Sequence, residues 1–272
     1  MTATRRTWWF AAVAAVAILA YILVPADGLL SPVLYYVTAT AAVAVLLATI
    51  LRMPRHGRPI WWAVLGYASL SIIADLIYAL QERSQAESAY PGVPDAIYLG
   101  AYASAFLALG LLIHRVNPGR DLEAWIDTAI IGIAASAIVA LFIIDPTVAA
   151  GGDIGTLAVT IWYPLIDVFL LAGLGRLLVR GVGRVNRAIA VLSAAFAITF
   201  IADLGYAFIG ANGLTQVTPG WPDSLYLVAY VLMAVAARSA GAVTVESSTR
   251  PLLSEHRTGR ARTLALGLAS VT

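Results

Sequence analysis

The sequence predicts an all-α integral membrane protein, and the composition and the long apolar runs are the observations behind this prediction. Of its 272 residues, 61% are hydrophobic and 12% are charged, whereas soluble domains carry about 25% charged residues. Apolar runs of about 20 residues can cross the hydrocarbon core of a bilayer as helices. These runs are continuous, whereas the strands of a membrane β-barrel alternate apolar and polar residues. Eight runs predict eight transmembrane helices: 8–24, 32–51, 60–80, 94–113, 124–144, 157–179, 188–209 and 222–240.

The eight predicted spans form two parallel four-helix repeats. Ile73–Tyr102 and Ile201–Tyr230 align without a gap at an offset of 128 residues, with identical residues at 14 of 30 positions. Four spans return the chain to the side from which it started, so both copies have the same orientation in the membrane. We therefore expect a first repeat at residues 1–115 and a second repeat at residues 116–240.

Arginine is unevenly distributed between the two sides of the predicted bundle. If all eight runs span the membrane, 16 of the 17 arginines lie on one side and only Arg83 lies on the other. Positive charge is retained on the cytoplasmic side. We therefore expect a multi-pass protein of the plasma membrane with a cytoplasmic N-terminus and both repeat ends cytoplasmic. Arg5 and Arg6 before the first run could also mark a signal peptide, but no clear small-x-small cleavage site follows, and the fifth run is the repeat partner of the first.

Two short segments follow the second repeat. Residues 241–262 are rich in Ser, Thr, Glu and Arg, and we expect them to form a cytoplasmic linker of low order. Residues 263–272 begin a new apolar run, but about ten residues are too few to span a bilayer. We therefore expect the sequence to stop within the start of a ninth helix.

Several kinds of chemistry are excluded by residue types that the sequence lacks. It contains no cysteine, which excludes disulfides and thiolate ligands, and no lysine, which excludes a retinal Schiff base. All three histidines fall on the predicted cytoplasmic side, so a haem held by two histidines within the membrane is excluded. Neither a Gly-rich phosphate loop nor a Ser-His-Asp set is present. We expect no enzymatic activity, cofactor or metal site in these residues, and we interpret the formal charge of +2 as topology, not as nucleic-acid binding.

The candidate binding residues include two aspartates at equivalent positions, Asp75 and Asp203. Hydroxyl side chains precede each aspartate by four residues and follow it by three, at Ser71, Tyr78, Thr199 and Tyr206. This spacing places hydroxyl, carboxylate and phenol on one helix face. Carboxylates within a span face the bundle interior or water. They could form a polar site open to the outside, or a hydrogen-bonded clamp between helices with Ser, Thr and Tyr as partners.

A second pair, Asp95 and Asp223, follows a proline at the expected outer start of the fourth and eighth helices. Proline and a carboxylate are both favourable in a first helical turn, so helix capping alone could explain this pair. Tyrosines continue along the same faces at Tyr98, Tyr102, Tyr226 and Tyr230. Together these side chains could line two equivalent pockets, or one pocket on the pseudo-two-fold axis, suited to a hard cation or an amine ligand.

Asp167 breaks the repeat symmetry, because its partner in the first repeat is Ala39. It lies about ten residues into the sixth run, three residues after Pro164 and near the expected midplane. An intramembrane carboxylate is a functional candidate. A structural aspartate next to a proline break would give the same pattern.

These motifs resemble those of a known family, the N-terminal membrane regions of actinobacterial cyclic-di-GMP signalling proteins. The matching motifs are Asp-Leu-x-Tyr (Asp75 to Tyr78, Asp203 to Tyr206), Pro-Asp-x-x-Tyr (Pro94 to Tyr98, Pro222 to Tyr226), Trp125-Ile126-Asp127 and Tyr163-Pro164-Leu165-Ile166-Asp167. In that family such regions precede diguanylate cyclase or phosphodiesterase domains. The resemblance covers most of the chain and implies an input region, but these residues include no catalytic domain, so no catalytic residue is carried over.

We therefore expect a membrane sensory or input domain with an outward-facing Asp/Tyr site that regulates a cytoplasmic cyclic-di-GMP enzyme. Its partners would be the lipid bilayer and a small ligand or cation on the outer face, and it could form a homodimer. Two alternatives stay open. One is a small parallel-repeat transporter that uses Asp167 as its coupling group. The other is a scaffold or dimerisation module in which the aspartates are only clamps.

Overall fold

The described part of the chain is entirely helical. The computed structural model describes residues 3–25, 28–84, 91–116, 126, 129–130, 132–133, 162–163, 165–175, 187–211 and 220–249, and no strand occurs within them. Five helices are long and apolar enough to cross a membrane: Leu30–Arg52, Arg55–Arg83, Val93–Arg115, Arg187–Ile209 and Trp221–Ala240. They coincide with five of the eight predicted runs. The prediction of a helical, multi-pass membrane protein is confirmed at this level.

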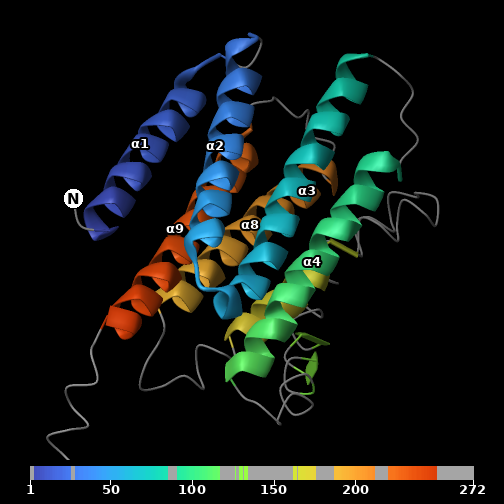
Figure 1. Ribbon diagram of the computed structural model, residues 1–272. Coiled ribbons are helices and arrows are strands. Elements are labelled where there is room, and N and C mark those ends of the chain that lie inside the picture. The colour runs from blue at the N-terminus through green and yellow to red at the C-terminus, as the bar shows by residue number, and fades with distance from the viewer. Residues whose placement is uncertain are drawn as a thin grey trace, which may run out of the picture.

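The residues assigned to the first predicted repeat form a row of four helices running up and down (Figure 1). They are α1 (Ala3–Leu23), α2 (Leu30–Arg52), α3 (Arg58–Arg83) and α4 (Val93–Val116), with a short 3-10 turn, η1 (Arg55–Gly57), between α2 and α3. The apolar part of α1, Thr7–Leu23, is shorter than the five long spans. α2 ends where Met53 adopts an extended backbone before Pro54, as the residue before a proline prefers.

The second repeat is described through α8 (Arg187–Ala211), α9 (Trp221–Thr249) and a helical segment at Leu165–Gly175. The fifth predicted run, 124–144, and the rest of the sixth lie almost wholly outside the described residues. α9 continues to Thr249, so this helix includes the first residues of the expected linker, 241–249. Nothing in the sequence breaks the helix there until Pro251, and adding residues to an existing helix is easy. The rest of the linker and the expected ninth helix lie outside the described residues.

The two repeats interlock through their second and fourth helices. α3 packs along α4, and the equivalent helices α8 and α9 pack in the same way. Across the repeats, α2 packs on α9. The equivalent segment Leu165–Gly175 packs on α4, where a Cβ added to Gly173 would come within 2.6 Å of Leu109 Cδ2. α2 carries small buried residues such as Ala39 and Ala42, and small residues let neighbouring membrane helices approach closely.

α1 is tied to the second repeat although it belongs to the first. It packs on α9 as well as on α2. Arg238 Nε on α9 donates a hydrogen bond to Thr7 Oγ at 3.1 Å, and the Arg187 guanidinium lies 6.0 Å from the centre of the Trp8 ring. The first helix is therefore held at one end by α8 and α9.

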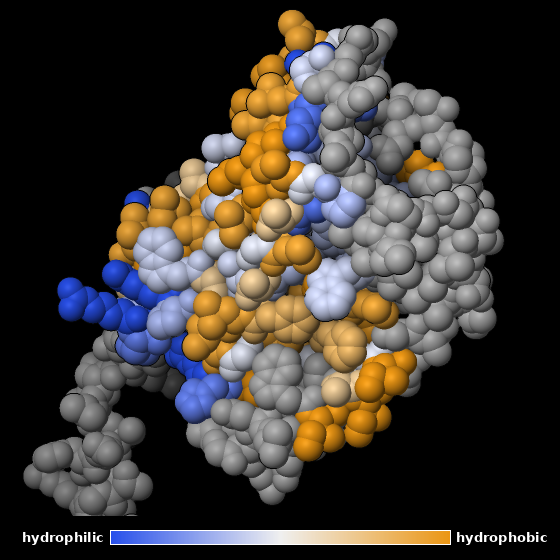
Figure 2. Space-filling view, turned by 90° about the vertical axis from the view of Figure 1, so that its right-hand side faces the viewer, coloured by the Kyte–Doolittle hydropathy of each residue, from blue (hydrophilic) through white to orange (hydrophobic). Residues whose placement is uncertain are grey.

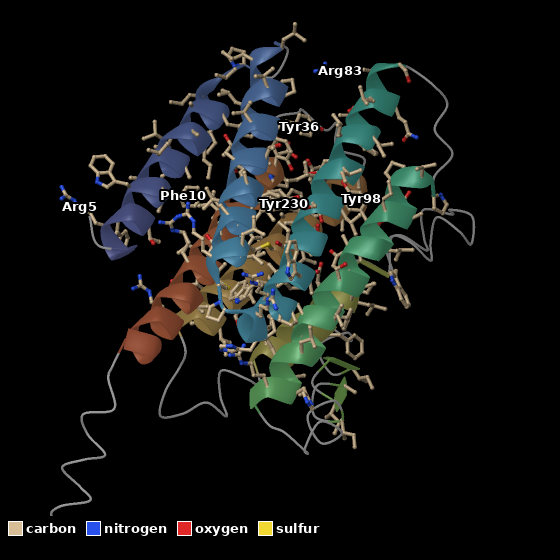
Figure 3. All side chains as sticks on the ribbon, in the orientation of Figure 1. Arg5, Phe10, Tyr36, Arg83, Tyr98 and Tyr230 are labelled. Carbon is tan, nitrogen blue, oxygen red and sulfur yellow. The ribbon has the colours of Figure 1, made fainter. Side chains whose placement is uncertain are left out.

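The described arginines separate the two ends of the bundle. Arg83 lies at one end and Arg5 at the other (Figure 3). We call the second the arginine end, because the helix termini that carry Arg52, Arg58, Arg115 and Arg187 also lie there. Between the ends, the described part of the face shown in Figure 2 carries several hydrophobic patches among weakly polar side chains, and the strongly hydrophilic side chains gather mainly at its margins. This distribution is that of a helical bundle immersed in lipid.

Candidate functional site

Asp75 on α3 accepts hydrogen bonds from phenols on three other helices. The Tyr98 hydroxyl on α4 donates to Oδ1 at 2.5 Å. The Tyr35 hydroxyl on α2 donates to Oδ2 at 2.8 Å, and the Tyr230 hydroxyl on α9 approaches the same oxygen at 3.4 Å. Tyr98 and Tyr230 are labelled beside each other in Figure 3. Two donors come from the first repeat and the third comes from the second repeat.

Asp203 on α8 is held in an equivalent but unequal way. The Tyr226 hydroxyl on α9 donates to Oδ1, as its repeat partner Tyr98 does to Asp75. The Tyr102 hydroxyl on α4 donates to Oδ2 at 2.7 Å. Tyr102 is the repeat partner of Tyr230, so each repeat sends one phenol from its fourth helix to the aspartate of the other repeat. This reciprocal exchange joins the two halves of the bundle.

Asp95 and Asp223 cap their helices in the same manner. The Gly92 amide donates to Asp95 Oδ2 at 2.7 Å, and the Gly220 amide donates to Asp223 Oδ2 at 2.9 Å. A carboxylate at the third helical position that accepts from the amide before the helix is half of a capping box. The capping predicted from the sequence is confirmed. The second oxygen of each aspartate accepts from a tyrosine: Tyr163 for Asp95 at 2.9 Å, and Tyr206 for Asp223.

Asp167 lies in the interior beside Asp203. It is 2% exposed, and its Oδ2 is 3.3 Å from the same Tyr102 hydroxyl that donates to Asp203. Its repeat partner, Ala39, has no polar side chain. In the first repeat the third donor to the aspartate is Tyr35, whereas the equivalent Tyr163 donates to Asp95 instead. Asp167 therefore lies beside Asp203 in the second repeat, whereas Tyr35 lies beside Asp75 in the first.

Three residues that the sequence assigned to the aspartate faces do not contact them. Tyr78 is 50% exposed, and none of the described hydrogen bonds of Asp75 involves it. The Ser71 hydroxyl donates to the Tyr67 carbonyl at 2.9 Å, and the Thr199 hydroxyl donates to the Ala195 carbonyl at 3.2 Å. Ser and Thr inside helices often bond the carbonyl four residues back. Neither hydroxyl donates to an aspartate, although Thr199 also forms a side-chain hydrogen bond with Tyr67 on α3.

Two tyrosines of the network were not assigned to the site from the sequence. Tyr35 and Tyr163 match each other in the repeat alignment, and that match was the signal that could have identified them. Tyr21 on α1 is a third addition, because its hydroxyl lies beside Asp223. The rings also pack on one another: the centroids of Tyr102 and Tyr163 are 5.9 Å apart, and those of Tyr206 and Tyr226 are stacked at 6.1 Å.

The chemistry of the network is that of a rigid polar joint. Asp75 and Asp203 each accept hydrogen bonds from at least two phenols that belong to other helices. Within the described helices, no group of three or more His, Cys, Asp or Glu side chains could hold a metal ion. The tyrosine hydroxyls already fill the hydrogen-bonding positions around the aspartates, so a ligand that bound an aspartate would have to displace a tyrosine. The arrangement favours the clamp over an open binding site.

Comparison with known proteins gives no identification. No protein-family model, curated protein or solved structure matches the chain. The likeness to cyclic-di-GMP signalling proteins therefore depends on the sequence motifs alone.

Proposed function

We propose that the chain is a membrane-embedded input domain whose signal acts by rearranging the aspartate–tyrosine joint. The observation that supports this is the exchange of phenols between the repeats, Tyr230 to Asp75 and Tyr102 to Asp203. Any relative movement of the two repeats has to lengthen or break these contacts. A displacement of whole helices would thus change a small number of hydrogen bonds in the joint.

The two hydrogen bonds that cross between the repeats differ in length, and this difference favours two arrangements of the bundle. The Tyr230 to Asp75 distance of 3.4 Å is close to the limit at which a hydrogen bond is lost. The Tyr102 to Asp203 distance is 2.7 Å. A ligand or a lipid environment that interacts differently with the two arrangements would shift their populations by that difference in free energy. A small ligand or cation on the Arg83 side is one such signal.

α9 connects the joint to the arginine end. It carries Asp223, Tyr226 and Tyr230 of the network and continues as one helix to Thr249. A helix of this length extends about 43 Å. With the arginine end cytoplasmic, as the positive charge predicts, α9 leads towards a cytoplasmic effector. The sequence resemblance favours a cyclic-di-GMP enzyme as that effector.

A reporter fusion tests the proposal. Residues 1–272 are joined to a diguanylate cyclase domain, and cellular cyclic-di-GMP is measured for the unchanged chain and for Asp75→Asn with Asp203→Asn. Because each interhelical hydrogen bond in a membrane contributes about 0.6 kcal/mol, we expect the double variant to change cyclase output at least about threefold. Tyr78→Phe, which lies outside the described network, is the matched control and should leave output unchanged.

The contrary results separate the alternatives. Unchanged output at unchanged membrane abundance would refute the input-domain proposal. A double variant that no longer accumulates in the membrane, with full output from the molecules that remain, would indicate a scaffold in which the aspartates only clamp helices.

Asp167 favours a second candidate, a small transporter with parallel repeats. A carboxyl group that is 2% exposed and lies beside a second carboxyl group is where a proton or cation could couple to transport. This candidate predicts proton- or cation-dependent uptake into proteoliposomes that Asp167→Asn abolishes. The absence of flux for every solute tested would count against it.

A further inference from the structure

The turn between α2 and α3 is a rigid frame at the arginine end. α2 ends at Arg52, η1 covers Arg55–Gly57 and α3 begins at Arg58. Arg58 folds back over the end of α2, where its Nε donates to the Met53 carbonyl at 2.8 Å and its Nη2 donates to the Leu51 carbonyl at 2.9 Å. These are carbonyls of the kind that a helix C-terminus leaves without partners. Met53 is 5% exposed. The turn is therefore held by the hydrogen bonds of Arg58 and by the burial of Met53.

Three further basic residues belong to this turn or directly precede it. Arg52, Arg55 and His56 are all exposed. The carboxylates among the described side chains lie elsewhere: Asp75, Asp95, Asp167, Asp203 and Asp223 belong to the network, and Glu82 lies beside Arg83 at the opposite end. None of these described carboxylates belongs to the turn.

The first turn of α3 adds an aromatic side chain suited to the membrane interface. Trp61 is buried, whereas its neighbour Trp62 is 43% exposed. Trp62 lies four residues after Arg58, which is about 6 Å along the helix axis. Indole rings are favoured at the level of the lipid headgroups. The exposed indole of Trp62 therefore marks this end of α3 as lying near the level of the lipid headgroups.

We propose that the α2–η1–α3 turn binds the phosphate of an anionic phospholipid through the guanidinium groups of Arg52 and Arg55. Guanidinium groups match phosphate with two parallel hydrogen bonds, which an ammonium group cannot do. Every one of the 17 basic charges of the sequence outside histidine is an arginine. Basic residues next to membrane helices are attracted to anionic headgroups on the cytoplasmic side. This site is independent of the aspartate–tyrosine joint.

Lysine substitutions distinguish lipid recognition from topology. Charge alone sets orientation, so lysine would serve as well as arginine if the turn only kept this end of the bundle cytoplasmic. The purified full chain is delipidated in mild detergent, mixed with phosphatidylglycerol or phosphatidylcholine, and examined by native mass spectrometry for retained lipid. Arg52→Lys with Arg55→Lys keeps the charge and removes the planar fork. Arg83→Lys, at the opposite end, is the matched control.

We expect the unchanged chain and Arg83→Lys to retain phosphatidylglycerol in preference to phosphatidylcholine. The double lysine variant should lose at least about threefold in phosphatidylglycerol retention. A double glutamine variant should lose about 25-fold, since each charge near an anionic surface contributes roughly fivefold. Equal retention of the two lipids by the unchanged chain would refute the site. Full retention by the double lysine variant, with a melting temperature equal to that of the unchanged chain, would also refute it and leave charge as the explanation.

Discussion

The Tyr102 hydroxyl lies between two carboxyl groups of the second repeat, those of Asp167 and Asp203. Tyr102 has one hydrogen to donate, and the shorter of its two contacts, 2.7 Å, goes to Asp203, whereas Asp167 lies at 3.3 Å. Asp75 depends less on its equivalent partner, Tyr230, because Tyr35 and Tyr98 already donate to it at 2.8 and 2.5 Å. Tyr102 and Tyr230, which are equivalent by sequence, are therefore expected to contribute unequally to stability.

This inequality predicts different effects of removing the two exchanged hydroxyls. Tyr102→Phe should lower the free energy of unfolding by about 1–2 kcal/mol, because it deprives the buried carboxyl group of Asp203 of a short hydrogen bond from the other repeat. Tyr230→Phe removes a contact at 3.4 Å and should have a clearly smaller effect. Tyr78→Phe, outside the network, should change stability by less than about 0.5 kcal/mol. Unfolding of the purified protein in detergent measures all three, and equal losses for Tyr102→Phe and Tyr230→Phe would show that the joint is symmetric.

The equivalent helix pairs α3–α4 and α8–α9 carry side chains of different size at one pair of equivalent positions. In the second pair, Gly205 on α8 faces Trp221 on α9, and a Cβ added to Gly205 would collide with the indole ring. The equivalent residues of the first pair are Ile77 and Val93. A glycine opposite a tryptophan in the second pair is thus replaced by two residues of intermediate size in the first pair. Trp221 and Val93 are both more than half exposed, so this exchange lies at the edge of the bundle.

A paired substitution tests this exchange of volume. Gly205→Ala should destabilise the protein by about 0.5–1.5 kcal/mol, since the added methyl group pushes the half-exposed indole ring of Trp221 off its preferred rotamer. Trp221→Val in the same molecule should restore most of the loss. Gly100→Ala is the matched control: its Cβ would lie an ordinary 3.7 Å from Leu70 Cδ1, and the repeat already has Val228 at the equivalent position. If Trp221→Val gives no recovery, the indole contact does not explain the need for glycine.

At the scale of the whole molecule, the helices were predictable and the connections between repeats were not. Hydropathy placed five long spans, and proline followed by aspartate identified the capped starts of α4 and α9. Helical spacing assigned Tyr78 to the Asp75 face, yet an offset of three residues leaves a rotation of about 60°, and Tyr78 points outwards while Tyr206 reaches Asp223. An internal repeat also suggests that each half completes its own site. The phenols that cross between repeats depend on how α2 and α9 pack, which no local pattern encodes.

Orientation in the membrane is a property of the whole molecule, and the absence of cysteine makes it directly measurable. The arginine distribution predicts that Ser84, next to Arg83, is outside the cell and that His56, in the α2–η1–α3 turn, is in the cytoplasm. Ser84→Cys should therefore react with a membrane-impermeant maleimide in intact cells, and His56→Cys only after permeabilisation. Both side chains are exposed, so reactivity reports the side of the membrane; Ala42→Cys, at a buried position of α2, should stay unreactive throughout.

The reversed labelling pattern would have consequences beyond topology. It would place the C-terminal end of α9 outside the cell, where it could not lead to a cytoplasmic enzyme, and the input-domain proposal would fail with it. The headgroup site at Arg52 and Arg55 would survive such a result only in an outer leaflet that contains anionic lipid. The expected pattern, in contrast, places the aspartate–tyrosine joint nearer the outer surface and the continuous helix α9 at the cytoplasmic exit, the arrangement that a signal crossing the membrane requires.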